Sequence, residues 1–520
     1  MNGAQSMMRS FVDSGVDVCF ANPGTSEMHF VAALDSAPEM RGVLTLFEGA
    51  ATGAADGYAR MAERPAAVLL HLGPGLGNGL ANLHNARKGR VPVVCVVGDH
   101  ATYHKRYDAQ LESDIETVAR NVSTWVRRAA RAQDLGGDAA DAVAAACGPP
   151  GQVATLILPA DVSWSDGGVV AAPRRAVPRK MVPTDVVESV GRLLRSGEPA
   201  ALFLGGEALR EKGQLAAARV AAETGVRVIC ETFPTRLERG PGLPAFERLA
   251  YLAEFAAMQL DGLRHLVLVD AKAPVSFFAY PDKQSWLVPE GCEVSVLAGG
   301  GDDVAAALES LADAVDAAPA SALIGLQQAS RPARPTGAVT GETVGQALGA
   351  LLPEGAIVSD EANTTGIYLP TPTAGAARHD WLTLTGGAIG QGLPLAVGAA
   401  VACPDRRVVA LEADGSALYT LQSLWTMARE QLDVTVVVLN NRSYAVLNME
   451  LGRVGAEQGG PKARDMLDLT RPDMDFVALS TGLGVPATRA QTAEEFTAQL
   501  ERSLGTPGPS LIEVVVPSIF

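Results

Sequence analysis

The stretch from Leu411 to Asn441, "LEADGSALYTLQSLWTMAREQLDVTVVVLNN", places polar residues at both ends of an otherwise apolar unit. The apolar runs before Asp414 and before Asn440–Asn441 predict two buried strands, and the residues between them predict a helix. Ligands of open α/β sheets bind at the carboxyl ends of the strands. We therefore expect Asp414 and the two asparagines to lie close together at one edge of a sheet.

The polar residues of this unit suit a phosphate and a hard metal ion. Gly415 and Ser416 open the predicted helix, whose free N–H groups and dipole favour an anion. One carboxylate and one amide oxygen are ligands that Mg²⁺ prefers when a diphosphate supplies the rest. On spacing alone, an Asp helix cap followed by an Asn-Asn turn explains the same residues equally well.

Short apolar strands alternate with helical patterns along the whole chain, which favours parallel sheets covered by helices. At 520 residues the chain is too long for one ordinary core. Two proline-rich stretches, one near residue 175 and one near residue 332, are typical of linkers. The prediction is an α/β protein of three doubly wound parallel-sheet domains, at residues 1–165, 183–325 and 335–520.

The amino-acid composition limits the expected binding partners and indicates the cellular compartment. The net charge is −16 and no basic run occurs, so neither nucleic acid nor an acidic membrane surface is an expected partner. No apolar stretch reaches about 18 residues, so no membrane span is predicted. The six cysteines are scattered without a C-x-x-C pair, and the N-terminus lacks a signal-peptide pattern. We expect a cytoplasmic protein with reduced thiols.

Asp-Gly followed after this interval by Asn-Asn resembles the signature of thiamine diphosphate-dependent enzymes. The chain is similar to the group of acetolactate synthase, benzoylformate decarboxylase and pyruvate oxidase over essentially its whole length. "EGAATGAADGYAR" from Glu48, "DEANTTG" at 360–366 and "TGGAIGQG" at 385–392 also match family patterns in the right order. One departure is Ala413, where the family has the first glycine of G-D-G.

The resemblance implies a set of ligands. Mg²⁺ would be held by Asp414, Asn441 and the carbonyl of Ser443. Thiamine diphosphate would be contacted by Asn363, Thr364, Gly387, Ile389, Gly415, Ser416 and Tyr444, together with Glu48.

Glu48 has a special role by resemblance. Activation of the cofactor needs a proton moved at its pyrimidine ring, and a carboxylate in a dry pocket suits that task. From the residues alone, an acid that satisfies free N–H groups at a helix start is the better explanation of Glu48. In the family this glutamate and the metal site come from different subunits, which implies a homodimer at minimum and commonly a homotetramer.

Three segments bear on the reaction. "FANPGTSEM" places Thr25 where benzoylformate decarboxylase has a substrate-binding serine, and "LLHLGPGLGNG" places His71 at that enzyme's catalytic histidine. The decarboxylase's second histidine falls near "APVSFFAYPD", where this chain has Phe277, Phe278 and Ala279. Loss of that histidine argues against a simple aromatic decarboxylase and predicts an apolar entrance to the site. That entrance favours carboligation or an aliphatic substrate.

Acetolactate synthase features are incomplete. Gln110 and Leu111 stand where those enzymes have a Phe-Gln pair, and their flavin-associated run has no counterpart, so FAD is not expected. His100 and His104 are four residues apart but lack an evident third metal ligand.

The prediction is a benzoylformate decarboxylase-like enzyme that decarboxylates a 2-oxo acid without oxidation and then protonates or ligates the product. The alternatives are an acetolactate synthase-type carboligase that condenses pyruvate with a second 2-oxo acid, and a catalytically silent relative that serves binding or regulation.

Overall fold

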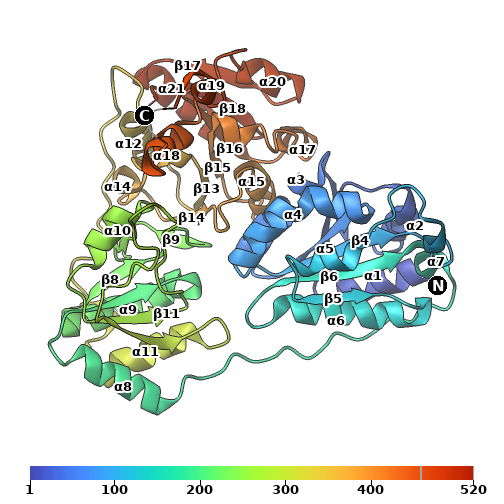
Figure 1. Cartoon of the computed structure of the whole chain (residues 1–520), viewed down its shortest axis with the longest axis horizontal. Helices are drawn as coiled ribbons and strands as arrows, with labels where there is room; N and C mark the ends of the chain where they lie inside the picture. The colour runs from blue at the N-terminus through green and yellow to red at the C-terminus, as the bar shows by residue number, and fades with distance from the viewer. Residues whose placement is uncertain (457–458, 519–520) are drawn as a thin grey trace.

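The computed structural model describes residues 1–456 and 459–518. Within that part of the chain the strands form three sheets, which follow one another along the chain except for β9 (Leu237–Arg239), a strand of the third sheet that lies between strands of the second (Figure 1). All strand pairs are parallel except one, at the edge of the third sheet. The predicted architecture of three parallel-sheet α/β domains is confirmed.

The first sheet has the strand order β2-β1-β3-β4-β6-β5. Its strands are β1 (Val18–Ala21), β2 (Arg41–Leu44), β3 (Ala66–Leu70), β4 (Val93–Asp99), β5 (Trp125–Arg128) and β6 (Val153–Pro159). The helices around it are α1 (Gly3–Asp13), α2 (Met28–Ala33), α3 (Glu48–Ala62), α4 (Leu72–Lys88), α5 (Ile115–Arg120), α6 (Leu135–Cys147) and α7 (Ala160–Trp164).

The second sheet has the order β10-β8-β7-β11-β12. Its strands are β7 (Ala200–Leu204), β8 (Arg227–Cys230), β10 (Glu247–Arg248), β11 (His265–Val269) and β12 (Glu293–Ala298). Its helices are α8 (Thr184–Leu194), α9 (Glu211–Thr224), α10 (Ala253–Leu260) and α11 (Val304–Ala314).

The third sheet has the order β17-β18-β16-β15-β13-β14-β9. Its strands are β9 (Leu237–Arg239), β13 (Ala356–Glu361), β14 (His379–Thr383), β15 (Val408–Ala413), β16 (Val434–Asn440), β17 (Ala487–Ala490) and β18 (Ser510–Val515). Its helices are α12 (Gly341–Leu351), α13 (Asn363–Gly366), α14 (Pro370–Thr373), α15 (Gly392–Ala402), α16 (Asp414–Ala417), α17 (Ser423–Arg429), α18 (Ala445–Arg453), α19 (Pro461–Asp465), α20 (Phe476–Gly482) and α21 (Ala493–Gly505).

The apolar runs of the sequence become strands because both faces of each sheet are buried. In β3, Val68 and Leu70 join one hydrophobic cluster, while Ala67 and Leu69 join another on the opposite face. Alternate side chains of a strand point to opposite faces, so a strand covered on both sides needs an unbroken apolar run. The strand pattern of the sequence is thus explained by burial.

One hydrophobic cluster extends from the first domain into the third. Helix α3 lies against α15 there, and a Cβ on Gly57 or on Gly398 would overlap backbone atoms of the facing helix. The small residues of both helices therefore allow their backbones to approach closely. This packing fixes the start of α3 relative to the third sheet.

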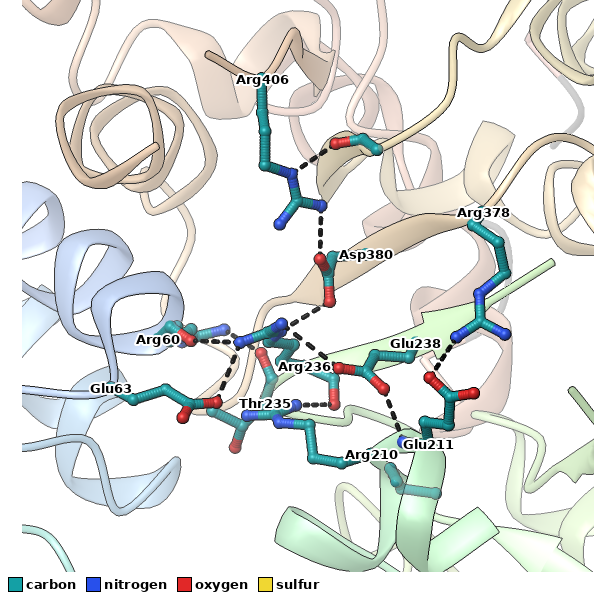
Figure 2. A network of polar contacts seen from close by, with 12 residues as sticks. Arg60, Glu63, Arg210, Glu211, Thr235, Arg236, Glu238, Arg378, Asp380 and Arg406 are labelled. Carbon is teal, nitrogen blue, oxygen red and sulfur yellow. Dashed lines mark hydrogen bonds and ion pairs between the residues drawn. The ribbon is translucent and has the colours of Figure 1, made fainter. Parts of the chain in front are cut away.

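The middle segment is tied to both other domains. Strand β9, which lies between β8 and β10 in the chain, leaves the second sheet and pairs antiparallel with β14 of the third. Arg236 precedes it, and its side chain donates to Asp380 Oδ1 at 2.6 Å and to the backbone oxygen of Arg60 at 3.3 Å (Figure 2). Three domains therefore meet at one arginine.

No helix in the described residues is both long enough and apolar enough to cross a membrane.

Candidate active site

Asp414 and the turn after β16 lie next to each other at the carboxyl edge of the third sheet. The carboxylate of Asp414 accepts the backbone N–H of Arg442 at 2.6 Å and that of Gly415 at 2.8 Å. Burial raises the pKa of Asp414 above its usual value, while the backbone donors act in the opposite direction. The spacing-based expectation that the two loops meet agrees with this geometry.

The two asparagines point to different partners. The amide nitrogen of Asn440 donates to Glu513 Oε1 at 2.8 Å, so this buried side chain holds β18 rather than a ligand. Asn441 lies just beyond the strand, and its side-chain oxygen accepts the N–H of Ser443 at 3.0 Å. Asp414, Asn441 and the Ser443 carbonyl form an oxygen-only set, which fits Mg²⁺ if phosphate oxygens complete the shell.

Side chains from two other segments pack closely around the start of α16. A Cβ on Gly415 would lie 2.5 Å from Cε1 of Tyr444, so the tyrosine ring packs directly over this glycine. Asn363 has a left-handed backbone with φ of 48°, and its amide nitrogen donates to Ser416 Oγ at 2.8 Å. Thr364 follows it and is partly buried. These residues surround the turn predicted to hold a diphosphate.

Glu361 is a site residue that the sequence reasoning missed. Its buried carboxyl accepts the N–H groups of Gly390 at 2.6 Å and Gly392 at 2.5 Å, so it anchors the loop between β14 and α15. Burial raises the pKa of Glu361 to about 7, against the effect of the backbone donors. The only sequence signal was an acidic residue at the end of an apolar strand.

The anchored loop carries Gly387 and Ile389. Gly387 has φ of 76°, and a Cβ there would overlap the ring of Phe277 from the middle domain. Ile389 is partly buried. Phe277 lies in an aromatic cluster, with ring centroids 4.9 Å from Phe278, 5.3 Å from Tyr251 and 5.9 Å from Phe233.

Glu48, His71 and Thr25 come from the carboxyl edge of the first sheet. Glu48 is the first residue of α3, is 7% exposed, and accepts a hydrogen bond from Asn78 Nδ2 at 3.0 Å. His71 caps α4. A Cβ on Gly75 would lie 3.3 Å from Glu48 Oε1 and 3.4 Å from His71 Cβ, so the two side chains flank the same glycine. Thr25 begins a short 3₁₀ helix and is exposed.

Asn82 connects the two halves of the predicted site within one chain. Its amide nitrogen donates to the backbone oxygens of Gly49 at 2.8 Å and Gly390 at 3.1 Å. Those residues directly follow Glu48 and Ile389. The sequence analysis did not single out Asn82, because its two partners are far away in the sequence.

The histidines at 100 and 104 do not form a metal site with other side chains. Their rings lie 5.3 Å apart, and His100 Nε2 is 3.0 Å from the backbone oxygen of Gln110. In the part of the chain that the structure describes, no three His, Cys, Asp or Glu side chains gather as metal ligands.

The comparison with models of protein families shows to which family the chain belongs. Residues 1–119 match the model described as "Thiamine pyrophosphate enzyme, N-terminal TPP binding domain", and residues 373–514 match the corresponding C-terminal domain. The chain belongs to the thiamine pyrophosphate enzyme family. Thiamine pyrophosphate and thiamine diphosphate are the same compound, so the predicted family is confirmed.

Relatives within the thiamine pyrophosphate enzymes carry two kinds of name. "Putative acetolactate synthase large subunit IlvX" from Mycobacterium tuberculosis is 62% identical over the full length of both chains. Benzoylformate decarboxylase from Pseudomonas aeruginosa is 30% identical over 97% of each chain. A solved 4-hydroxybenzoylformate decarboxylase from Rhodococcus jostii RHA1 is 25% identical, with a TM-score of 0.87 over 99% of each chain.

Proposed function

We propose that this chain is a thiamine diphosphate- and Mg²⁺-dependent enzyme that decarboxylates a 2-oxo acid without oxidation, in the manner of benzoylformate decarboxylase. Its product is then protonated to an aldehyde or ligated to a second carbonyl. The cofactor supplies the electron sink for loss of CO₂, and the protein supplies position and electrostatics. Asp414, Asn441 and the Ser443 carbonyl are proposed as the Mg²⁺ ligands, because they offer oxygen atoms at adjoining strand ends.

The proposed cofactor contacts lie around this metal site. The diphosphate is assigned to the start of α16, with Gly415, Ser416, Asn363 and Thr364, since backbone N–H groups at a helix start favour an anion. For the rings we assign Gly387, Ile389 and Tyr444. The hydrogen bonds from Gly390 and Gly392 to Glu361 support a fixed shape for that loop.

Glu48 is proposed to move the proton that activates the cofactor. Its carboxyl is almost completely buried, and Asn78 fixes one of its oxygens. A positioned carboxyl out of contact with water is an effective general acid or base.

The observation that carries the decarboxylase assignment is His71 beside Glu48. The two flank Gly75, and His71 remains 24% exposed in its side chain. An imidazole so placed can deliver a proton to a product at the site, which ends the reaction at an aldehyde. Thr25 is proposed to contact the substrate from the neighbouring turn.

Acetolactate synthase-type carboligation is the second candidate. The 62% identical relative carries that name, and the aromatic cluster at Phe277 and Phe278 offers an apolar surface near Gly387. A catalytically silent relative is disfavoured because Glu48, Asp414 and Asn441 are all present.

A homodimer or homotetramer in the cytoplasm is proposed on the family resemblance alone, because Asn82 already joins Gly49 and Gly390 within one chain. FAD is not included.

The deciding experiment separates the products. The protein with thiamine diphosphate and Mg²⁺ is incubated with a panel of 2-oxo acids, and CO₂, aldehyde and acyloin are measured by mass spectrometry. We expect CO₂ with aldehyde as the main product, and a fall of at least about tenfold in aldehyde formation for His71→Ala.

The matched control is His29→Ala, an exposed histidine of the same domain that faces Trp164. It should leave the products unchanged. Acyloin as the main product would favour the carboligase, and absence of CO₂ with every acid would overturn the proposal.

A further inference from the structure

A carboxyl group that no predicted role explains lies behind His71. Glu27 ends the short 3₁₀ helix Thr25–Glu27 after β1, and its side chain is 0% exposed. Its Oε2 accepts the backbone N–H of Gly24 at 2.9 Å and lies 2.8 Å from Nδ1 of His71. Its Oε1 accepts Ser26 Oγ–H at 2.6 Å. The carboxyl is therefore held from three sides.

Two glycines make room for this pair. A Cβ on Gly24 would overlap the imidazole ring of His71, and a Cβ on Gly98 of β4 would overlap Oε1 of Glu27. Any larger residue at either position would push the carboxyl and the ring apart. The contact between Glu27 and His71 thus depends on residues from three separate segments of the chain. It is therefore determined by the fold rather than by local sequence.

The backbone next to His71 also has an uncommon conformation. Leu72 is buried and has φ of 52°, in the left-handed region that bulky residues rarely adopt. It turns the chain from β3 into α4 directly after His71. Backbone strain of this kind persists where the surrounding structure holds a side chain in a required direction.

The hydrogen-bond chemistry assigns the proton between the two residues. Both oxygens of Glu27 accept a hydrogen bond, from Gly24 N–H and from Ser26 Oγ–H, which favours the ionised carboxylate. A carboxylate can only accept, so Nδ1 of His71 carries the hydrogen between them; Ser26 Oγ lies farther from Nδ1, at 3.4 Å. A histidine fixed in this way has Nε2 as its free nitrogen, which can take or give a proton. The other carboxyl beside the imidazole is Glu48, across Gly75.

We propose that Glu27 is the positioning residue of His71: it holds the hydrogen on Nδ1, fixes the ring, and leaves Nε2 for proton transfer at the site. The consequence for catalysis rests on the proposed function. The position of the hydrogen on His71 does not rest on the proposed function, so an experiment can contradict either one without the other.

The first test reads the hydrogen position directly. The full-length protein is labelled with ¹⁵N only in its histidine rings, and solid-state spectra of the sedimented protein are recorded. We expect hydrogen on Nδ1 of His71, and a shift of this hydrogen toward Nε2 in Glu27→Gln. Hydrogen on Nε2 in the parent protein would overturn the proposal without any variant being needed.

The second test reads the kinetic consequence. Glu27→Gln should lower kcat for aldehyde formation by at least about tenfold, with KM and thiamine diphosphate affinity changed by less than about twofold. Equal losses in cofactor affinity and kcat would show a merely structural role and contradict positioning.

Glu198→Gln is the matched control. It removes a carboxylate that lies 2.7 Å from His265 Nε2 in the middle domain. It should move only the His265 signals and leave kcat unchanged. If the parent releases no CO₂ from any 2-oxo acid, the proposed function fails, while the spectra still decide the role of Glu27.

Discussion

The backbone N–H of Arg442 donates to Oδ2 of Asp414 at 2.6 Å, and this bond joins the turn after β16 to the first residue of α16. Asn441 directly precedes Arg442, and its side-chain oxygen accepts the N–H of Ser443 at 3.0 Å. Oδ1 of Asp414 accepts the N–H of Gly415 at 2.8 Å. Burial raises the pKa of Asp414, and the backbone donors of Gly415 and of the turn at 441–443 act in the opposite direction. Backbone donors from two adjoining loops therefore hold the carboxylate of Asp414 in place.

Asp414→Asn should remove the charge but keep the shape of this arrangement. Because a carboxylate is the only charged ligand in the proposed set, we expect thiamine diphosphate affinity in the presence of Mg²⁺ to fall at least about tenfold. Calorimetric titration with and without Mg²⁺ measures it. Asp433→Asn, at the opposite end of β16, is the matched control. Unchanged affinity in Asp414→Asn would exclude this residue as a ligand.

Glu48→Gln tests the activating carboxyl. The amide keeps an acceptor for Asn78 Nδ2 but cannot exchange a proton in the same way, so we expect deuterium exchange at C2 of bound thiamine diphosphate to slow at least about a hundredfold. Quenched exchange followed by NMR of the released cofactor measures the rate. Glu63→Gln, just beyond the other end of α3, should exchange at the parent rate. Equal rates in parent and Glu48→Gln would remove Glu48 from this role.

Local sequence could predict the strands and Asp414, because the required signals stand next to one another in the chain. A strand buried on both faces needs a continuous apolar run, and an acid after such a run must lie at the sheet edge. The position of Asn441 at the sheet edge could be predicted by the same argument. The hydrogen bond of Asn440 could not be predicted in this way, since its partner Glu513 comes 73 residues later.

Contacts between distant segments could not be predicted. Glu27 looks like an ordinary helix-start acid until β3 brings His71 to it, and Asn82 looks like a surface amide until two domains close around it. Strand β9 carries no local sign that it leaves its own domain for β14. Such choices depend on the three-dimensional packing of whole elements, which one sequence does not display.

His379 on β14 predicts how stability depends on pH. Burial, with Arg239 on the paired strand β9 as a lesser cause, lowers the pKa of His379 to about 4. In the unfolded chain the pKa of this histidine has its ordinary value of about 6.5. Between about pH 6.5 and pH 4 the unfolded chain therefore binds a proton that the folded chain does not bind. Stability from this residue is present above about pH 6.5 and is lost as the pH falls toward 4.

The variant His379→Gln cannot titrate. The unfolding free energy of the parent relative to this variant should therefore decrease by about 2–3 kcal/mol between pH 7 and pH 4. Thermal unfolding of both proteins over this pH range measures the difference. His29→Gln, at an exposed position, should follow the parent at every pH. A constant difference between parent and His379→Gln would show that folded His379 binds a proton as readily as the unfolded chain does, and would contradict the lowered pKa.

Phe277→Ala tests whether the aromatic cluster contacts the substrate. The ring touches Gly387 and is 41% exposed, so part of its surface is available to an apolar group at the proposed site. An aromatic contact contributes about 1 kcal/mol beyond its buried area, and 1.4 kcal/mol is a factor of ten in affinity. We expect kcat/KM for 2-oxo acids with large apolar side chains to fall about tenfold, and that for pyruvate to change less than about threefold.

Phe255→Ala serves as the control, since Phe255 is exposed on α10 outside this cluster. Steady-state release of CO₂ across the acid panel measures both variants. Equal losses for pyruvate and for the larger acids would indicate damage to the Gly387 loop, because Phe277 would then support the loop rather than select the substrate.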